Sequence, residues 1–281
     1  VLIPVLIDRK MMFADQDYRQ TRREWIYRQA FHMGRHLIGY EIEKVLAAVD
    51  WIRQFHGGHR KIGVAGYLEG GLIAFYSAAI DPRIDAALVS GYFSDREHTW
   101  EEPIYRNVWG LVSEFGDAEI AGLAAPNALV IEYSSIPEIL DGPRPDSSRL
   151  YRYSGYKGRL STPAYPGVKK EFDRIGQLVK TGFQKRALVA GPKNEAVEFG
   201  SAKALEYFAG YLGLSRLEKA SGSVPSDRRK SFDPEERQIR QLRELNDHVQ
   251  GLLRVSDYER NRFFLHKIMP EWANKAWSTK S

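Results

Sequence analysis

The residues with the clearest chemical implication form the stretch Gly66-Tyr67-Leu68-Glu69-Gly70. Its spacing is that of G-x-S-x-G, in which a serine on a sharp strand-to-helix turn attacks a carbonyl carbon. Here the central position holds a leucine, whose side chain has no lone pair and cannot act as a nucleophile. The motif therefore predicts the frame of a hydrolytic site without its attacking atom.

Other side chains near this motif could supply parts of a polar site. Glu69 follows the central position, and its place at the expected helix start favours a role as a cap or acceptor. Glu132 ends an apolar run and is a candidate acid. A loop after a predicted strand contains His98, the best single candidate base, together with the acids Asp95, Glu97, Glu101 and Glu102. Because ligands of α/β proteins bind beyond the carboxyl ends of strands, this loop is a second candidate site.

The remaining histidines and glycines do not point to a metal or a cofactor. His32 and His36 are four residues apart in a stretch with helical pattern, but no H-E-x-x-H motif accompanies them. Gly66, Gly70 and Gly71 do not form G-x-G-x-x-G, which argues against a dinucleotide site. We therefore expect neither a metal nor a cofactor.

Strands alternating with helices must position these side chains. Continuous apolar runs predict strands at residues 1–8, 61–67, 86–93, 128–132 and 185–191. Apolar residues at helical spacing predict helices at 23–55, 70–79, 168–180 and 196–213. The alternation favours the α/β class, with a doubly wound, mostly parallel sheet. Residues 61–67 and 86–92 should be neighbouring parallel strands joined by the helix that starts near Gly70.

Composition changes after residue 214 divide the chain into three parts. Residues 1–214 carry the α/β pattern, 215–231 read as a linker, and 232–281 read as a helical extension. Asp233 followed by Pro234 is a helix start, with an N-cap aspartate and a proline at the first position. One stripe of this helix should be buried against the domain or a partner, and it comprises Leu242, Leu245, Val249, Leu252 and Leu253.

Composition limits the class of protein further. Of 281 residues, 43% are hydrophobic, which suffices for a full core, and the net charge is only +5. The basic residues are mixed with acids, so the charge pattern does not favour a nucleic-acid partner. There is no cysteine, which excludes disulfides and thiolate chemistry and is compatible with an exported or a cytosolic protein. No apolar run reaches the roughly 18 residues of a membrane span.

Residues 1–214 resemble the α/β-hydrolase superfamily, in particular its dienelactone hydrolase and acetyl xylan esterase-like branch. The resemblance rests on the elbow spacing, on the following AAIDPRIDAALVSGYF and on DAEIAGLAAPNALVIEY. It implies a nucleophile at Leu68, an acid near Glu132 and a histidine in the loop Pro192-Lys193-Asn194-Glu195, which contains none. It also implies that N-terminal strands, with a second oxyanion N–H, would lie upstream of residue 1.

The resemblance leaves three hypotheses. The first is a hydrolase-like domain without catalysis, kept as a binding module beside other domains of a longer precursor. The second is an esterase that acts on a small or carbohydrate ester through a displaced constellation of Glu69, Glu97, His98 and Glu101. The third is a structural domain whose helical extension mediates assembly. The tyrosine-rich segment 151–160 would suit stacking on a sugar ring or holding an acidic ligand, although a surface loop packed by its own tyrosines is the better explanation.

Overall fold

A computed structural model describes residues 1–12, 20–56, 60–140, 158–179, 182–218, 222 and 226–270. Four parallel strands form its central sheet in the order β3-β4-β5-β8, at Gly63–Tyr67, Ala86–Ser90, Ala128–Glu132 and Arg186–Val189. Gly63 is in register with Ala86, as expected for neighbouring parallel strands. Helix α3 (Glu69–Ile80) joins them, so the predicted β3-α3-β4 unit is confirmed. The fold is therefore mixed α/β with a parallel sheet.

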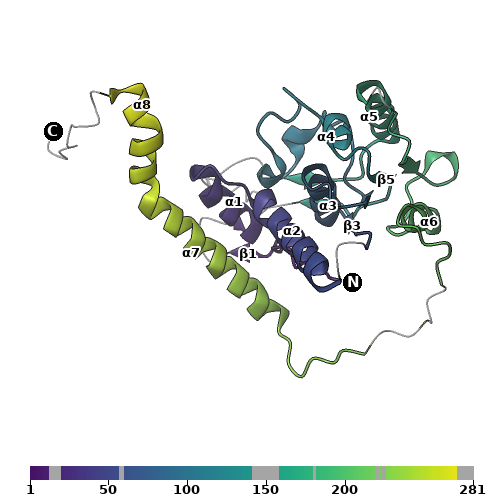
Figure 1. Ribbon diagram of the computed structural model, residues 1–281, viewed down its shortest axis with the longest axis horizontal. Coiled ribbons are helices and arrows are strands. Elements are labelled where there is room, and N and C mark those ends of the chain that lie inside the picture. The colour runs from purple at the N-terminus through teal and green to yellow at the C-terminus, as the bar shows by residue number, and fades with distance from the viewer. Residues whose placement is uncertain are drawn as a thin grey trace, which may run out of the picture.

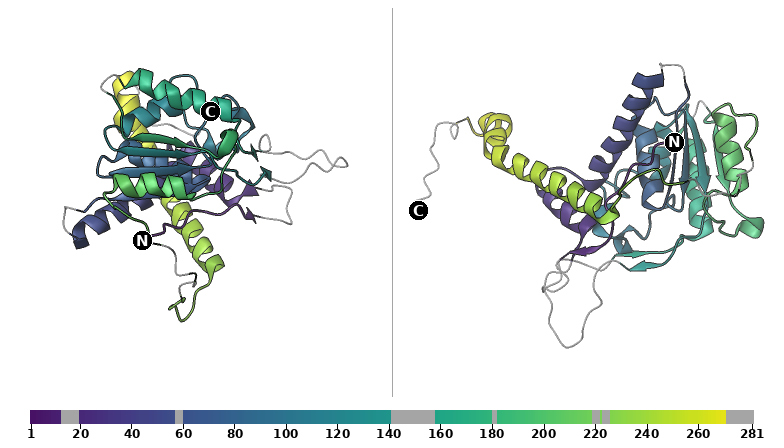
Figure 2. Two further views of the ribbon diagram at one scale, coloured as in Figure 1. Left: turned by 90° about the vertical axis from the view of Figure 1, so that its right-hand side faces the viewer. Right: turned by 90° about the horizontal axis from the view of Figure 1, so that it is seen from below.

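Helices cover both faces of this sheet (Figure 2). One face packs on α2 (Leu37–His56), α3, α4 (Asp117–Leu123) and α5 (Tyr165–Leu178), which contribute to the main hydrophobic core. The other face packs on α6 (Ala202–Tyr211) through Leu88, Val130 and Val189. Strands β4 and β5 are buried along their whole length, which explains their continuous apolar sequences.

The shorter elements lie around the sheet. Two-residue strands pair as antiparallel ladders, β1 with β2 (Met11–Met12, Gln20–Thr21) and β6 with β7 (Ile139–Leu140, Arg159–Leu160). Short helical turns are η1 (Thr99–Glu101), η2 (Ile104–Arg106) and η3 (Pro192–Asn194). The predicted tyrosine-rich segment lies, as far as residue 157, outside the described residues.

The prediction of a strand at residues 1–8 is wrong. No strand pairs with residues 1–8 in the described part of the chain, and the first strand, β1, begins only at Met11. Side chains take up its backbone groups instead, since the Ile7 N–H donates to Glu41 at 3.0 Å and Lys44 donates to the Val5 carbonyl at 3.0 Å. Only Ile7 is fully buried, so an apolar run alone was not sufficient for a strand.

The predicted helix at 23–55 is interrupted. Helix α1 (Arg22–His32) ends before Gly34, whose φ of 66° is in the left-handed region, and α2 begins at Leu37. His32 and His36 therefore do not share one helix face. Instead, His36 Nδ1 accepts from the Ile38 N–H at 3.1 Å at the start of α2.

The predicted helix after Asp233 is confirmed as far as Ile268, with differences in burial, and residues 271–281 of the predicted extension lie outside the described residues. Helix α7 (Pro234–Arg260) starts after Asp233, whose carboxylate accepts from the Glu235 N–H at 2.8 Å, and η4 (Asn261–Leu265) and α8 (His266–Ile268) continue it. Its first half lies along α1, and its second half runs on beyond the domain (Figure 1). Within the predicted stripe, Leu242 and Val249 are buried, Leu245 and Leu252 are half-buried, and Leu253 is exposed. Among the described residues, no helix is both long and apolar enough to cross a membrane.

Candidate functional site

Leu68 occupies the turn between β3 and α3, where the motif places it. Its backbone has φ 57° and ψ −114°, a conformation that costs a non-glycine residue roughly 1–3 kcal/mol. Hydrogen bonds fix this turn, because the Leu68 N–H donates to the Ser90 carbonyl and the Leu72 N–H donates to the Leu68 carbonyl, both at 3.0 Å. The side chain is only 8% exposed. The apex therefore presents a buried isobutyl group at the position of a nucleophile.

Glu69 is the first residue of α3, and its carboxylate is held in a buried ion network instead of capping the helix. Arg106 donates to both of its carboxylate oxygens, at 2.8 and 2.7 Å, and Arg9 Nη2 lies 2.6 Å from Oε2. Burial alone would raise the pKa of Glu69, but the charges of Arg106, Arg23 and Arg9 and the Arg106 hydrogen bond outweigh it and hold the pKa far below its usual range. Glu69 thus remains an ionised acceptor and is unsuited to proton transfer.

Glu132, the candidate acid, is committed to a structural network. It is 1% exposed and accepts from Ser90 Oγ at 2.6 Å, from the Gly200 N–H at 3.0 Å and from the Ser201 N–H at 2.8 Å. Ser201 Oγ donates to it as well, at 2.7 Å. The carboxylate therefore binds the end of β5 to the start of α6, a favourable site for a negative charge.

The loop after β8 brings an aromatic ring to the turn where the resemblance implies an imidazole. Phe199 stacks on Tyr67, with ring centroids 5.3 Å apart. The Tyr67 hydroxyl donates to the Ser135 carbonyl at 2.8 Å. Residues 190–201 contain no histidine, so no base lies on this loop.

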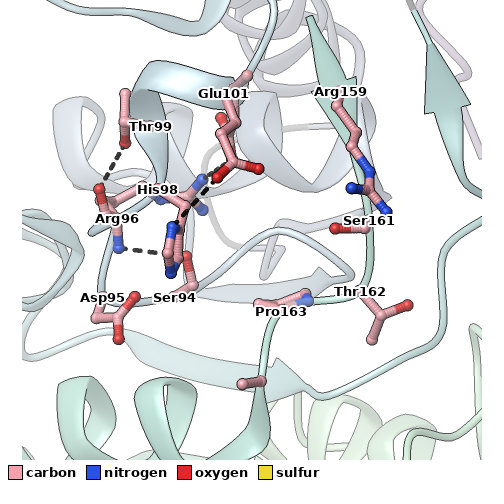
Figure 3. Close-up of a pocket in the computed structure, with 12 residues that line it drawn as sticks. Ser94, Asp95, Arg96, His98, Thr99, Glu101, Arg159, Ser161, Thr162 and Pro163 are labelled. Atoms are coloured by element: carbon pink, nitrogen blue, oxygen red, sulfur yellow. Dashed lines mark hydrogen bonds and ion pairs between the residues drawn. The ribbon is translucent and has the colours of Figure 1, made fainter.

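A separate polar pocket of about 320 Å³ lies beyond the carboxyl end of β4 (Figure 3). One wall carries His98 and Glu101, whose Nδ1 and Oε1 atoms are 3.5 Å apart, and the facing wall carries Arg159, Ser161 and Thr162. The His98 side chain is 79% exposed, so it is not desolvated.

A buried ion pair supports the floor of this pocket. Arg96 lines the pocket and donates through Nε to Asp117 at 2.9 Å and through Nη1 to Glu102 at 2.9 Å. Burial raises the pKa of Asp117 to about 6, although Arg96 opposes the shift. Because Arg96 is already paired with two carboxylates, it serves to hold the loop 94–102 in place.

The structure brings together only part of the predicted constellation. His98 and Glu101 share the pocket, whereas Glu97 lies outside its lining and pairs with Lys170 at 3.3 Å. Leu68, Glu69 and Glu132 do not line the pocket either. Arg159 on the facing wall belongs to the tyrosine-rich segment 151–160 that the sequence singles out as a possible ligand-binding segment. Arg9, Arg106 and the pocket residues 161–164 were not predicted, because no local pattern connects them with the turn or with His98.

The carboxylates and histidines of the described residues do not form a metal site. Within the described ranges, no group of three His, Asp or Glu residues is placed to hold a metal ion.

Comparison of the chain with family models, with curated proteins and with solved structures finds no match.

Proposed function

We propose that residues 1–214 form an α/β-hydrolase-like domain that does not use the serine mechanism and acts as a non-catalytic binding module. The observation that carries this proposal is Leu68, an apolar residue held in a strained conformation at the apex of a strand–helix turn. Strained positions of this kind cluster at active sites, where a reactive side chain benefits from them. A leucine gains no chemistry there, so the turn is kept by the packing of β3 on α3.

The surroundings of the turn support the same proposal. Glu132 has its two oxygens occupied by four donors, and Phe199 lies beside Tyr67 on the loop that would have to carry the base. The Glu132 carboxylate is therefore not available to orient a base, and a phenylalanine ring cannot act as one. The polar pocket at His98 is then the natural binding site, suited to a small hydroxyl-bearing or ester ligand.

A second candidate function is hydrolysis of an ester in that pocket. The observation in its favour is the 3.5 Å approach of His98 to Glu101 on one pocket wall. A histidine oriented by a carboxylate can activate a water molecule. Against it, the exposed imidazole lacks the water-excluded surroundings that strengthen such catalysis.

Ester hydrolysis by the purified chain should be near background. A full triad contributes about a million-fold to the rate, and binding and oxyanion interactions alone leave about a thousand-fold. Leu68→Ser should not restore turnover, since no base is placed to accept the serine proton. The measurement is release of p-nitrophenol from p-nitrophenyl acetate by the wild type and by Leu68→Ser, against a buffer blank.

His98→Ala is the control that separates the two candidate functions. Saturable turnover by the wild type that this variant abolishes would establish the displaced site and overturn the binding-module proposal. Glu97→Ala is the matched variant, because Glu97 is in the same loop but outside the pocket lining. It should leave any such turnover unchanged.

A further inference from the structure

We propose that helix α7 is a strap that holds the N-terminal segment 5–9 in place and, through Arg9, controls the order of the ion network behind Leu68. This inference is independent of the proposed function. It concerns three parts of the molecule that are far apart in sequence: α7, segment 5–9 and the β3–α3 turn. Each link is a bond between named atoms.

The first link joins α7 to the backbone of segment 5–9. Gln238 makes two bonds to this segment, accepting from the Asp8 N–H at 3.2 Å and donating to the Leu6 carbonyl at 2.9 Å. Arg22 on α1 binds both Asp8, at 2.9 Å, and Glu235 of α7. Because the segment has no strand partner in the described chain, these side chains replace the hydrogen bonds of a sheet.

The second link joins segment 5–9 to the turn. Arg9 lies 2.6 Å from Glu69, and its Nε donates to the Tyr105 hydroxyl at 3.0 Å. Two residues before Arg9, the Ile7 carbonyl accepts a hydrogen bond from Arg23 at 2.7 Å, and Arg23 also pairs with Glu41. Segment 5–9 is thus part of a buried charge network. The central carboxylate of this network belongs to Glu69, the residue directly after Leu68. A displaced segment would remove one cation from Glu69.

Helix α7 is the weakest part of this arrangement, because only its first half lies along the domain (Figure 1). Leu242 and Val249 are its only buried side chains among the described residues, whereas Leu253, Val255 and Tyr258 are exposed. Elements with few buried contacts open at lower free energy than a central sheet. α7 can therefore detach while β4 and β5 stay folded.

Gln238→Ala tests the first link, and amide hydrogen exchange of the full chain is the readout. Two lost hydrogen bonds should speed exchange in residues 5–9 by roughly tenfold, and residues 68–72 should follow by roughly threefold. Peptides from 128–132 in β5 should keep their wild-type rate. Gln250→Ala is the matched control, since this glutamine is in the same helix and has no described bond to segment 5–9; it should change none of the three rates.

Arg9→Ala tests the second link separately. It should speed exchange in 68–72 by a similar factor while α7 residues 238–245 keep their protection. Faster exchange in 5–9 without any change in 68–72 for Gln238→Ala would overturn the coupling, and no change in 5–9 would overturn the strap itself. Equal acceleration of 128–132 would indicate global unfolding and would also contradict a local strap.

Discussion

Gly66→Ala should destabilise the domain by about 3–5 kcal/mol, whereas Gly70→Ala should be neutral or stabilise it by up to about 1 kcal/mol. The two glycines flank the same turn, but their surroundings differ. A Cβ on Gly66 would overlap the backbone carbonyl group of Gly70, which cannot move without breaking the turn. A Cβ on Gly70 would meet nothing within 4 Å.

Chemical denaturation followed by circular dichroism measures this contrast directly. In a domain of this size, the same loss should lower the melting temperature of the Gly66→Ala variant by roughly 6–20 °C relative to the wild type. Gly70→Ala should reduce the entropy of the unfolded chain and cost nothing in the folded helix. Equal destabilisation by both substitutions would show that Leu68 is not held by close packing of β3 on α3.

The parallel sheet could be predicted from the sequence because its determinants are local. Runs such as 86–90 and 128–132 are apolar throughout, and each is bounded by turn residues. The turn at Leu68 could be predicted for the same reason, since Gly66 must approach the following helix closely. These features require no knowledge of distant residues.

Segment 1–8 and the helix at 23–55 were mispredicted for a common physical reason. Apolar content indicates burial, but a strand also needs a neighbouring strand, and residues 5–8 have side chains of Glu41, Lys44 and Gln238 as partners instead. Likewise, helical periodicity continues across Gly34, whereas the backbone turns there. In both cases tertiary contacts decided between conformations that the local pattern leaves open.

The candidate site could be predicted only in part. The position of His98 and Glu101 in the loop after β4 could be predicted, because this loop directly follows an apolar strand. The facing wall of the pocket, at 159–164, lies some sixty residues later in the chain. Arg106 and Arg9 carry no motif, and their pairing with Glu69 depends on packing between distant segments. Long-range charge pairs of this kind leave no periodic signal in a single sequence.

The same charge network leads to the second large effect. Arg106→Met should destabilise the domain by about 3–5 kcal/mol at neutral pH, because it leaves the ionised Glu69 without its bidentate partner in a buried position. Lys169→Met is the control, because it removes an exposed ion pair with Asp173 and should cost about 0.5 kcal/mol or less. Equal effects of the two substitutions would mean that Glu69 is solvated.

The pH dependence provides the sharper test of the Arg106 prediction. In the wild type, Arg106 and its neighbours outweigh burial and lower the pKa of Glu69 in the folded state, so its contribution to stability is present above the ordinary pKa of 4.5 and is lost as the pH falls below it. In Arg106→Met, burial opposes ionisation with less compensation, so protonation relieves the stranded charge instead. The difference in unfolding free energy between wild type and variant should therefore be largest near pH 7 and shrink as the pH falls through the pKa that Glu69 has in the folded variant. Urea titrations at pH 7 and pH 4 measure it, and a difference that stays constant with pH would show that packing of the Arg106 side chain, and not its charge on Glu69, stabilises the turn.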